Sequence, residues 1–301
     1  MAKYHNDFGI FQLIDRKAFE FLIEKHQMDK SVRSLKTWDL TQALVDALTL
    51  RLSSFREIEG AIEIPRSTLG DALSNRFPGF FQDLCDLVLN QIRGCTADRK
   101  TRRAIREVLA IDSTECRVHG GIFSLPGWQT RRANGGKAAC KLHVVFNMEG
   151  QWIDDFKVTG VRKHDSPVSL ELRLLPGKTY VFDRAYNDID FWLKIMASGS
   201  HFVTRLKDCA RIRKLLADVL SKAGDKDGVI WDGLYVPSPM QFHLHREKLE
   251  VTQIRHIIYR DPETKKIFHF ATSDRRASAQ VIAKIYKRRW AVELLFRWLK
   301  S

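Results

Sequence analysis

The chain has 301 residues, 44% of them hydrophobic, so it can bury a core large enough for two domains or one elaborate domain. Its net charge of +14 favours a polyanionic partner such as nucleic acid over the plainer alternative, a basic enzyme without one. The five cysteines are widely spaced and form no Cys-x-x-Cys, which argues against disulfides or zinc and favours a reducing cytoplasm. No apolar run approaches about 18 residues, so no membrane span is expected.

Residues 1–92 are predicted to form a helical domain. Apolar residues recur at helical spacing over Ala18–His26, Thr41–Leu52 and Phe80–Ile92. Between the last two lies a pattern of two short helices around a turn, with Ser53 or Ser54 capping the first and Pro65 starting the second. The pair resembles a helix-turn-helix, in which Arg66–Leu73 would enter a DNA major groove. A plain helical hairpin fits the same pattern.

Residues 93–107 are predicted to be a basic linker. They are rich in Arg and Lys and contain no large apolar residue before Ile105. Their charges suit the phosphate backbone of DNA, where each neutralised phosphate steepens the salt dependence of binding. A solvated connector fits the composition equally well.

From residue 108 the pattern changes to strands. Strands are predicted over 108–115, 137–147, 151–160, 179–186 and 201–206, with helices over 166–175 and 188–198. Short connections make the first three strands an antiparallel meander, and the later alternation implies parallel strands with crossover helices. The expected architecture is α/β, with a mixed five-stranded sheet covered by helices.

Residues from about 210 to 275 interrupt that alternation. A helix is predicted over 211–221, followed by β-like segments at 229–236, 241–247, 250–260 and 266–273. The stretch is therefore predicted to be a β-rich insertion within the sheet domain. A closing helix is expected over 277–300.

Two aspartates stand at the ends of predicted strands. Asp112 follows the apolar run 108–111, and Asp183 follows the run 180–182. Either alone would be an ordinary turn or cap residue. If their strands are neighbours, the two carboxylates lie close together and repel one another unless a cation sits between them. With Glu293 from the closing helix they make a cluster suited to divalent metal and phosphate chemistry.

The closing helix carries four chemically distinctive residues on one stripe. Tyr286, Arg289, Glu293 and Lys300 are separated by 3, 4 and 7 residues. At about 100° per residue, these offsets bring the four side chains within roughly 60° of one another. One face of the helix therefore presents a carboxylate flanked by cations and a phenol.

Together these segments resemble the DDE transposases of the insertion sequence 4 family. The stripe matches the family's Tyr-(2)-Arg-(3)-Glu-(6)-Lys signature, and IDST and VFDRAY resemble its two catalytic Asp contexts. The resemblance implies a ribonuclease-H-like catalytic domain over 108–301 with its β-rich insertion at about 210–275. A helical DNA-binding domain over 1–92 and the linker over 93–107 would precede it.

The resemblance also implies roles for the site residues. Asp112, Asp183 and Glu293 would be the catalytic ligands of Mg²⁺, for which Mn²⁺ could substitute. Arg289 and its neighbours on the stripe would contact the DNA of the element end near the reacting phosphate. For Arg289 the alternative is an ion pair with Glu293, four residues along the helix. Tyr286 and Lys300 would contact the same DNA.

Two tryptophans are candidates for stacking on DNA bases. Trp231 lies in the insertion, where related hairpin-forming enzymes stack an aromatic ring on a flipped base. Its alternative role is a core residue of the insertion. Trp128 is the second candidate, and a surface loop anchor is its alternative.

The implied function is cut-and-paste DNA transposition. A metal-activated water would cut the element end, and the freed 3′-hydroxyl would attack the target DNA. Double-stranded DNA at the ends and at the target would be the partner, bound by a homodimer in the bacterial cytoplasm. Family members continue for several tens of residues beyond their signature Lys, so the chain is expected to be truncated at its C-terminus. The alternatives are a truncated copy that binds element DNA without catalysis, and a ribonuclease-H-like nuclease that cuts without joining.

Overall fold

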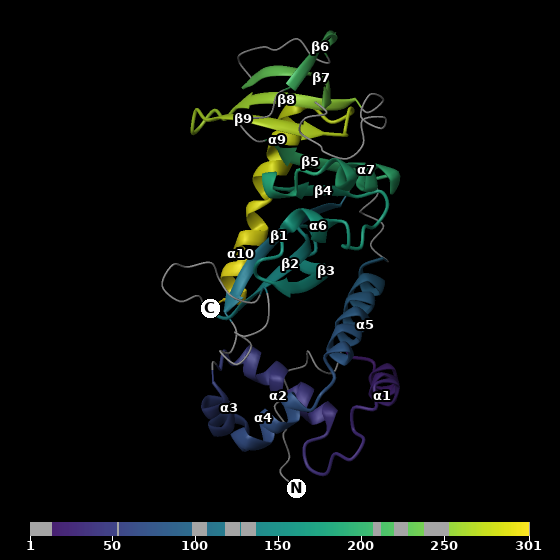
Figure 1. Ribbon diagram of the computed structural model, residues 1–301, viewed down its shortest axis with the longest axis vertical. Helices are drawn as coiled ribbons and strands as arrows, with labels where there is room; N and C mark the ends of the chain where they lie inside the picture. The colour runs from purple at the N-terminus through teal and green to yellow at the C-terminus, as the bar shows by residue number, and fades with distance from the viewer. Residues whose placement is uncertain are drawn as a thin grey trace. The chain divides into compact units, whose positions relative to one another are not determined.

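The computed structural model describes residues 14–52, 54–97, 107–117, 127, 137–206, 212–219, 228–237 and 253–300. The chain divides into two compact units, residues 1–100 and residues 101–301 (Figure 1). No described helix is long and apolar enough to cross a membrane.

The described part of the first unit consists of helices, without a strand. They are α1 (Arg16–Lys25), α2 (Thr37–Thr49), α3 (Phe55–Ile62), α4 (Arg66–Ser74) and α5 (Pro78–Ala97). The helices bury two small apolar clusters. One joins α1 to α5, where the ring of Phe19 meets that of Phe80 edge-on at 5.5 Å. The other lies among α2, α3 and α4 around Leu40 and Leu69.

The two short helices around a turn are confirmed. The Ser54 side chain accepts a hydrogen bond from the backbone N–H of Glu57 and caps α3, and Pro65 is the N-cap of α4. Between them, Glu63 adopts a left-handed conformation with φ 59° and ends α3.

The prediction of a linker from residue 93 is wrong for residues 93–97, because α5 continues to Ala97. The prediction relied on Gly94 and on the lack of large apolar residues. A single glycine costs a helix only about 1 kcal/mol, and this stretch contains no proline, so the helix continues. Residues 98–106 lie outside the described part of the chain.

The second unit is built on a mixed sheet. Its first five strands are β1 (Val108–Arg117), β2 (Ala139–Asn147), β3 (Trp152–Gly160), β4 (Thr179–Phe182) and β5 (His201–Arg205). As predicted, β1, β2 and β3 form an antiparallel meander, while β4 and β5 are added in parallel.

The β-rich stretch that was predicted as an insertion at about 210–275 extends this sheet. Its strands are β6 (Ile212–Val219), β7 (Val229–Pro237), β8 (Ile254–Arg260) and β9 (Ile267–Thr272). The described strands have the order β3-β2-β1-β4-β5-β9-β8-β7-β6, nine in one sheet. The predicted number of five is therefore wrong. The antiparallel pairing of β9 with β5 covers a strand edge that would otherwise be open.

The predicted helix over 211–221 is also wrong. Its apolar residues, Ile212, Leu215, Leu216 and Val219, have helical spacing in the sequence. The backbone nevertheless pairs antiparallel with β7, with a register shift between Lys214 and Val219. Pairing with a neighbouring strand has overridden the local preference. The predicted strand at 241–247 lies outside the described residues.

Helices cover both faces of the sheet (Figure 1). On one face lie the short α6 (Asp165–Ser169) and α7 (Ile189–Ala197), whose Trp192 packs on Phe202 of β5. On the other lie α9 (Ala279–Arg288) and α10 (Trp290–Leu299). Because helices cover both faces, Val108–Ile111 of β1 and the four residues of β4 are all buried, without alternation. The helix predicted over 166–175 is shorter, because α6 ends at Ser169; beyond it the N–H of Arg173 bonds to Asp155.

The closing helix is divided at Arg289, whereas one continuous helix was predicted. The N–H of Arg289 bonds to the carbonyl of Tyr286 at 3.0 Å, and the N–H of Val292 bonds to the carbonyl of Arg289 at 3.1 Å. These three-residue bonds tighten the turn. The helix is therefore locally tightened at one of the predicted site residues.

Candidate active site

Asp112 and Asp183 lie side by side. Ile111 of β1 is in parallel register with Phe182 of β4, so the two aspartates follow at the same level of adjacent strands, about 4.8 Å apart. The residues two positions earlier in each strand belong to the core under α9 and α10. Because side chains alternate along a strand, both carboxylates point to the face that these helices cover.

Arg289 joins two of the predicted carboxylates. Its Nη1 donates to Asp112 at 2.5 Å, and its Nη2 donates to Glu293 at 2.8 Å. The side chains of Arg289 and Asp112 are only 16% and 18% exposed, so water screens the pair weakly. The predicted ion pair within the helix is confirmed, and the same guanidinium also reaches across to the sheet.

The pKa of Asp112 is influenced by the other two carboxylates. Burial raises the pKa of Asp112 to about 6. Arg289 and the backbone N–H of Ser113 lower this pKa, while Asp183 and Glu293 raise it. Carboxylates from β1, the end of β4 and α10 therefore belong to one electrostatic cluster.

Metal binding at this cluster requires a rearrangement. Across the described ranges, no three His, Cys, Asp or Glu side chains lie in a position to hold a metal ion. The guanidinium of Arg289 stands between Asp112 and Glu293, where a cation would be expected. The carboxylate oxygens are the hard donors that Mg²⁺ prefers. The donor set therefore fits Mg²⁺ once Arg289 turns to another anion.

Tyr286 lies at the edge of this cluster. Its ring packs on Phe270 of β9 at 5.0 Å, and the guanidinium carbon of Arg289 is 6.0 Å from the ring centroid. Burial raises the pKa of Tyr286, so its hydroxyl keeps its proton at neutral pH. The structure therefore brings together five of the predicted site residues.

The other predicted DNA contacts lie apart from the cluster. Lys300 is exposed at the end of α10, and its side chain makes no hydrogen bond or ion pair within the described residues. Trp231 is half-buried in β7, four strand spacings or about 19 Å from β4. Trp128 lies outside the described residues.

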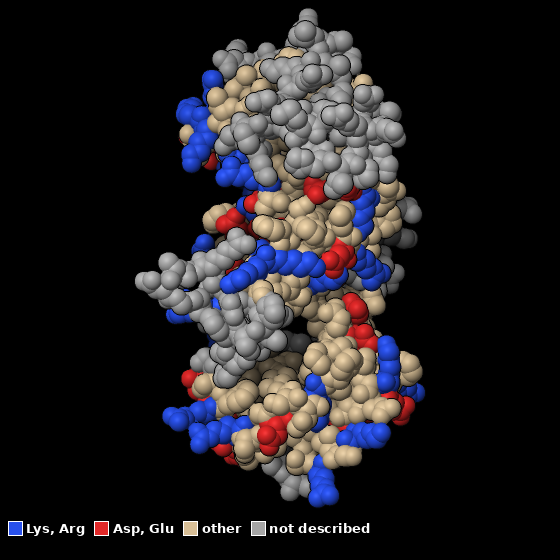
Figure 2. Space-filling view, viewed as in Figure 1, with Lys and Arg blue, Asp and Glu red and all other residues tan. Residues whose placement is uncertain are grey.

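A groove beside Tyr286 was not predicted from the sequence. It has a volume of about 480 Å³ and lies between the β8–β9 hairpin and α9. Phe268 and Phe270 line it, and exposed Lys266, Lys284 and Lys287 stand at its rim. Figure 2 shows Lys and Arg gathered on the flank where this hairpin lies. Only the pairing of β8 with β9 and the packing of α9 bring these residues together.

A second polar cluster supports β1 directly after Asp112. The Ser113 hydroxyl donates to Asp165 at 2.7 Å. The carboxylate of Asp165 also lies 3.5 Å from Lys141 and 3.4 Å from Nδ1 of His143. Burial lowers the pKa of His143 to about 4, which keeps the imidazole neutral. The cluster holds β1, β2 and the start of α6 together.

We expect His143 to make the protein acid-sensitive. The unfolded state binds a proton on this imidazole below its ordinary pKa of about 6.5, and the folded state only near 4. Stability is therefore lost as the pH falls through this window, by about 3 kcal/mol in total. The raised pKa of Asp112 acts in the opposite direction over an overlapping range. The measurement is urea unfolding of the wild type and His143→Gln from about pH 7 to about pH 4.

The advantage of the wild type over His143→Gln should shrink by about 3 kcal/mol across that range, because the contribution of Asp112 cancels in the comparison. If the free energies of unfolding of the two proteins changed equally with pH, His143 would not be held in its neutral form in the folded state.

Comparison with known proteins places the second unit in a family. The model of the transposase DDE domain matches residues 103–301, and a domain of unknown function, DUF4372, matches residues 9–70. A putative transposase, y4zB, of Sinorhizobium fredii is 30% identical over 77% of this chain and 61% of its own length. A probable transposase for the element IS5377 of Geobacillus stearothermophilus is 32% identical over 68% of this chain and 51% of its own length.

The chain thus spans about half to three fifths of the length of these curated relatives. Among solved structures, a piggyBac transposase in a synaptic complex with hairpin DNA aligns over 95% of this chain and 66% of its own, with a TM-score of 0.51. At 11% identity this similarity concerns the fold alone.

Proposed function

The chain belongs to the transposase DDE domain family, and we propose that it is a cut-and-paste DNA transposase of the insertion sequence 4 group. The observation that carries the proposal is the cluster of Asp112, Asp183 and Glu293 with Arg289 at its centre. The partner is double-stranded DNA, at the element ends and at the target. A homodimer would hold two ends together.

In the proposed mechanism Asp112, Asp183 and Glu293 would hold the metal. Bound Mg²⁺ would activate the attacking oxygen and stabilise the leaving oxygen of the phosphodiester, with Mn²⁺ able to substitute. In the free protein Arg289 neutralises two of these carboxylates. When DNA binds, its planar guanidinium would turn to the phosphate next to the scissile bond. The Tyr286 ring, whose centroid is 6.0 Å from the guanidinium carbon, would limit where that guanidinium can turn.

Lys300 and Trp231 are proposed to contact DNA outside the cluster. The exposed Lys300 would bind backbone phosphate as a point charge. The half-buried Trp231 would stack on a base some distance from the scissile phosphate. The aromatic groove beside Tyr286, with its lysine rim, supports a path for DNA along this flank.

Replacing Arg289 should separate metal binding from cleavage. Arg289→Ala removes the cation that occupies Asp112 and Glu293, so we expect Mn²⁺ to bind about tenfold more tightly. Cleavage should fall at the same time, because the phosphate loses its guanidinium. Calorimetric Mn²⁺ titration and a cleavage assay measure the two effects.

The matched control for this prediction is Arg288→Ala. Arg288 is the preceding residue, the last of α9, but it pairs with Glu149, outside the carboxylate cluster. It should change neither quantity. Weaker Mn²⁺ binding by Arg289→Ala would show that Arg289 organises the carboxylates and does not compete for them.

The function itself is tested by the products formed on DNA. The full chain would be incubated with duplexes carrying the ends that flank its own gene, in Mg²⁺ or in chelator, together with a target plasmid. Metal-dependent cuts that leave 3′-hydroxyl ends, followed by joined products in the plasmid, are expected. Cuts without joined products would identify a nuclease. Binding without cuts would identify a DNA-binding protein that does not catalyse.

A further inference from the structure

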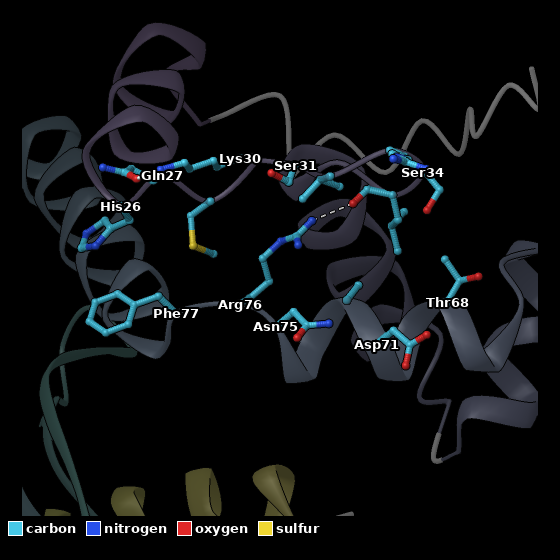
Figure 3. Close-up of a pocket in the computed structure, with 15 residues that line it drawn as sticks. His26, Gln27, Lys30, Ser31, Ser34, Thr68, Asp71, Asn75, Arg76 and Phe77 are labelled. Atoms are coloured by element: carbon cyan, nitrogen blue, oxygen red, sulfur yellow. Dashed lines mark hydrogen bonds between the residues drawn. The ribbon is translucent and has the colours of Figure 1, made fainter.

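The first unit contains a pocket that the catalytic proposal does not use. It has a volume of about 440 Å³ and lies between the α1–α2 connection on one side and α4 on the other (Figure 3). Gln27, Lys30, Ser31 and Ser34 stand on the connection, while Thr68, Asp71 and Asn75 come from α4 or its end. The pocket is thus flanked by the second helix of the helix-turn-helix-like pair.

A buried arginine crosses this pocket. Arg76 is 7% exposed and extends toward the α1–α2 connection (Figure 3). Its Nε donates to the Thr37 hydroxyl at 3.0 Å, and its Nη2 donates to the carbonyl of Leu35 at 2.7 Å. The carboxylate of Asp29 is 3.7 Å from Nη2. Within the described residues, Nη1 makes no hydrogen bond, so a fixed guanidinium offers unused donors to the pocket.

Cations outnumber carboxylates in the lining of this pocket. Arg76 and the exposed side chains of Lys30 and Arg33 line it, against the carboxylate of Asp71, while Asp29, which pairs with Arg76, lies outside the lining. Lys30 makes a hydrogen bond to Gln27 at 3.2 Å, which leaves two of its donors, and Arg33 has no ion pair within the described part of the unit. The hydroxyls on the same connection add neutral donors. This is the donor set that proteins direct at phosphate oxygens.

We propose that this pocket binds a backbone phosphate of the DNA duplex that lies on α4. The inference rests on the proposed function, in which the protein binds element DNA. The guanidinium of Arg76 is held from behind by Thr37 and Leu35, so little entropy is lost when it meets the phosphate. Lys30 and Arg33 close the rim from the solvent side. A phosphate clamped here would fix the register of α4 on the duplex, because phosphate contacts position while base contacts specify.

The test measures the salt dependence of DNA binding by the full chain. A duplex carrying the element end would be titrated with the wild type and with Lys30→Gln/Arg33→Gln, which leaves Arg76 in place. Removing the two rim cations from this one phosphate should flatten the slope of log K against log salt by about 0.9 and weaken binding about eightfold near 0.1 M salt. The matched control is Lys17→Gln/Arg51→Gln, which removes the same charge from exposed residues outside the pocket.

A third variant is expected to change the DNA affinity in the opposite direction. Asp71→Asn removes the pocket's lining carboxylate from an exposed position of α4 with little effect on folding, so we expect tighter DNA binding by severalfold. Loss of a merely structural contact would not strengthen binding. Tighter binding by Asp71→Asn and weaker binding by the Lys30→Gln/Arg33→Gln protein would together support the pocket.

The remaining outcomes overturn the inference. Equal losses in the pocket and control variants would mean that net charge alone acts. If inorganic phosphate raises the melting temperature of the wild type but not of Lys30→Gln/Arg33→Gln, while both bind DNA equally, the pocket takes free phosphate and not DNA. If the wild type cleaves element DNA and the pocket variant binds it normally, only this inference fails. If the wild type neither binds nor cleaves, the proposed function fails with it.

Discussion

Asp112→Asn is expected to lower the rate of DNA cleavage by at least about a thousandfold. Burial raises the pKa of Asp112, whose charge interacts with those of Asp183 and Glu293 and whose carboxylate accepts a hydrogen bond from Arg289. The amide keeps the shape of the side chain but removes the charge that would hold Mg²⁺. The rate would be measured on element-end duplexes in Mg²⁺ and in Mn²⁺.

The matched control is Glu115→Gln, three residues farther along the same strand. Glu115 is exposed, and strand alternation turns it to the opposite face of the sheet from Asp112. Cleavage by this control should equal that of the wild type. A thermal melt of both variants shows that they fold. Wild-type cleavage by Asp112→Asn would refute the proposed centre.

The largest expected loss of stability follows from Asp232→Asn. Asp232 of β7 and Arg255 of β8 form a paired contact of 2.7 and 2.6 Å, and their side chains are 1% and 4% exposed. Removing one member leaves a buried charge without its partner, which costs about 3–5 kcal/mol. For a unit of this size the melting temperature should fall by about 10 °C.

This ion pair also supports the active site. Arg255 donates to the carbonyls of Asp274 and Ala277, in the segment that leads into α9. Because α9 continues into the helix of Arg289 and Glu293, we expect Asp232→Asn to lower cleavage as well as stability.

Two further variants decide the cause of that loss. Asp232→Leu/Arg255→Met replaces both charges with apolar groups and should recover most of the stability. Glu263→Gln breaks the exposed pair with Lys287 and should leave the free energy of unfolding essentially unchanged. Equal stability of Asp232→Asn and the wild type would show that water reaches the buried pair.

The elements with strong local signals were predicted correctly. The cap at Ser54, the antiparallel meander and the parallel strands before Asp183 follow from side chains within a few residues of one another. The helix predicted over 211–221 is instead the strand β6. The spacing of apolar residues favours a helix locally, but it contains no information about the neighbouring strand β7, with which this segment pairs. The prediction of five strands was wrong for the same reason. The edge of β5, which the sequence pattern left unpaired, pairs with β9 of a hairpin that is distant in the sequence.

By itself the sequence determined the class of the fold, the strand ends that carry Asp112 and Asp183, and the helix stripe with Arg289 and Glu293. These depend on periodicity, capping and chain direction, which act over one or two turns or a single strand. Only the tertiary structure decided that Arg289 binds Asp112, 177 residues away, as well as its helix neighbour. It alone brought the α1–α2 connection against α4 to make a pocket. Contacts between distant segments depend on the complete packing of the chain, and no local pattern encodes their partners.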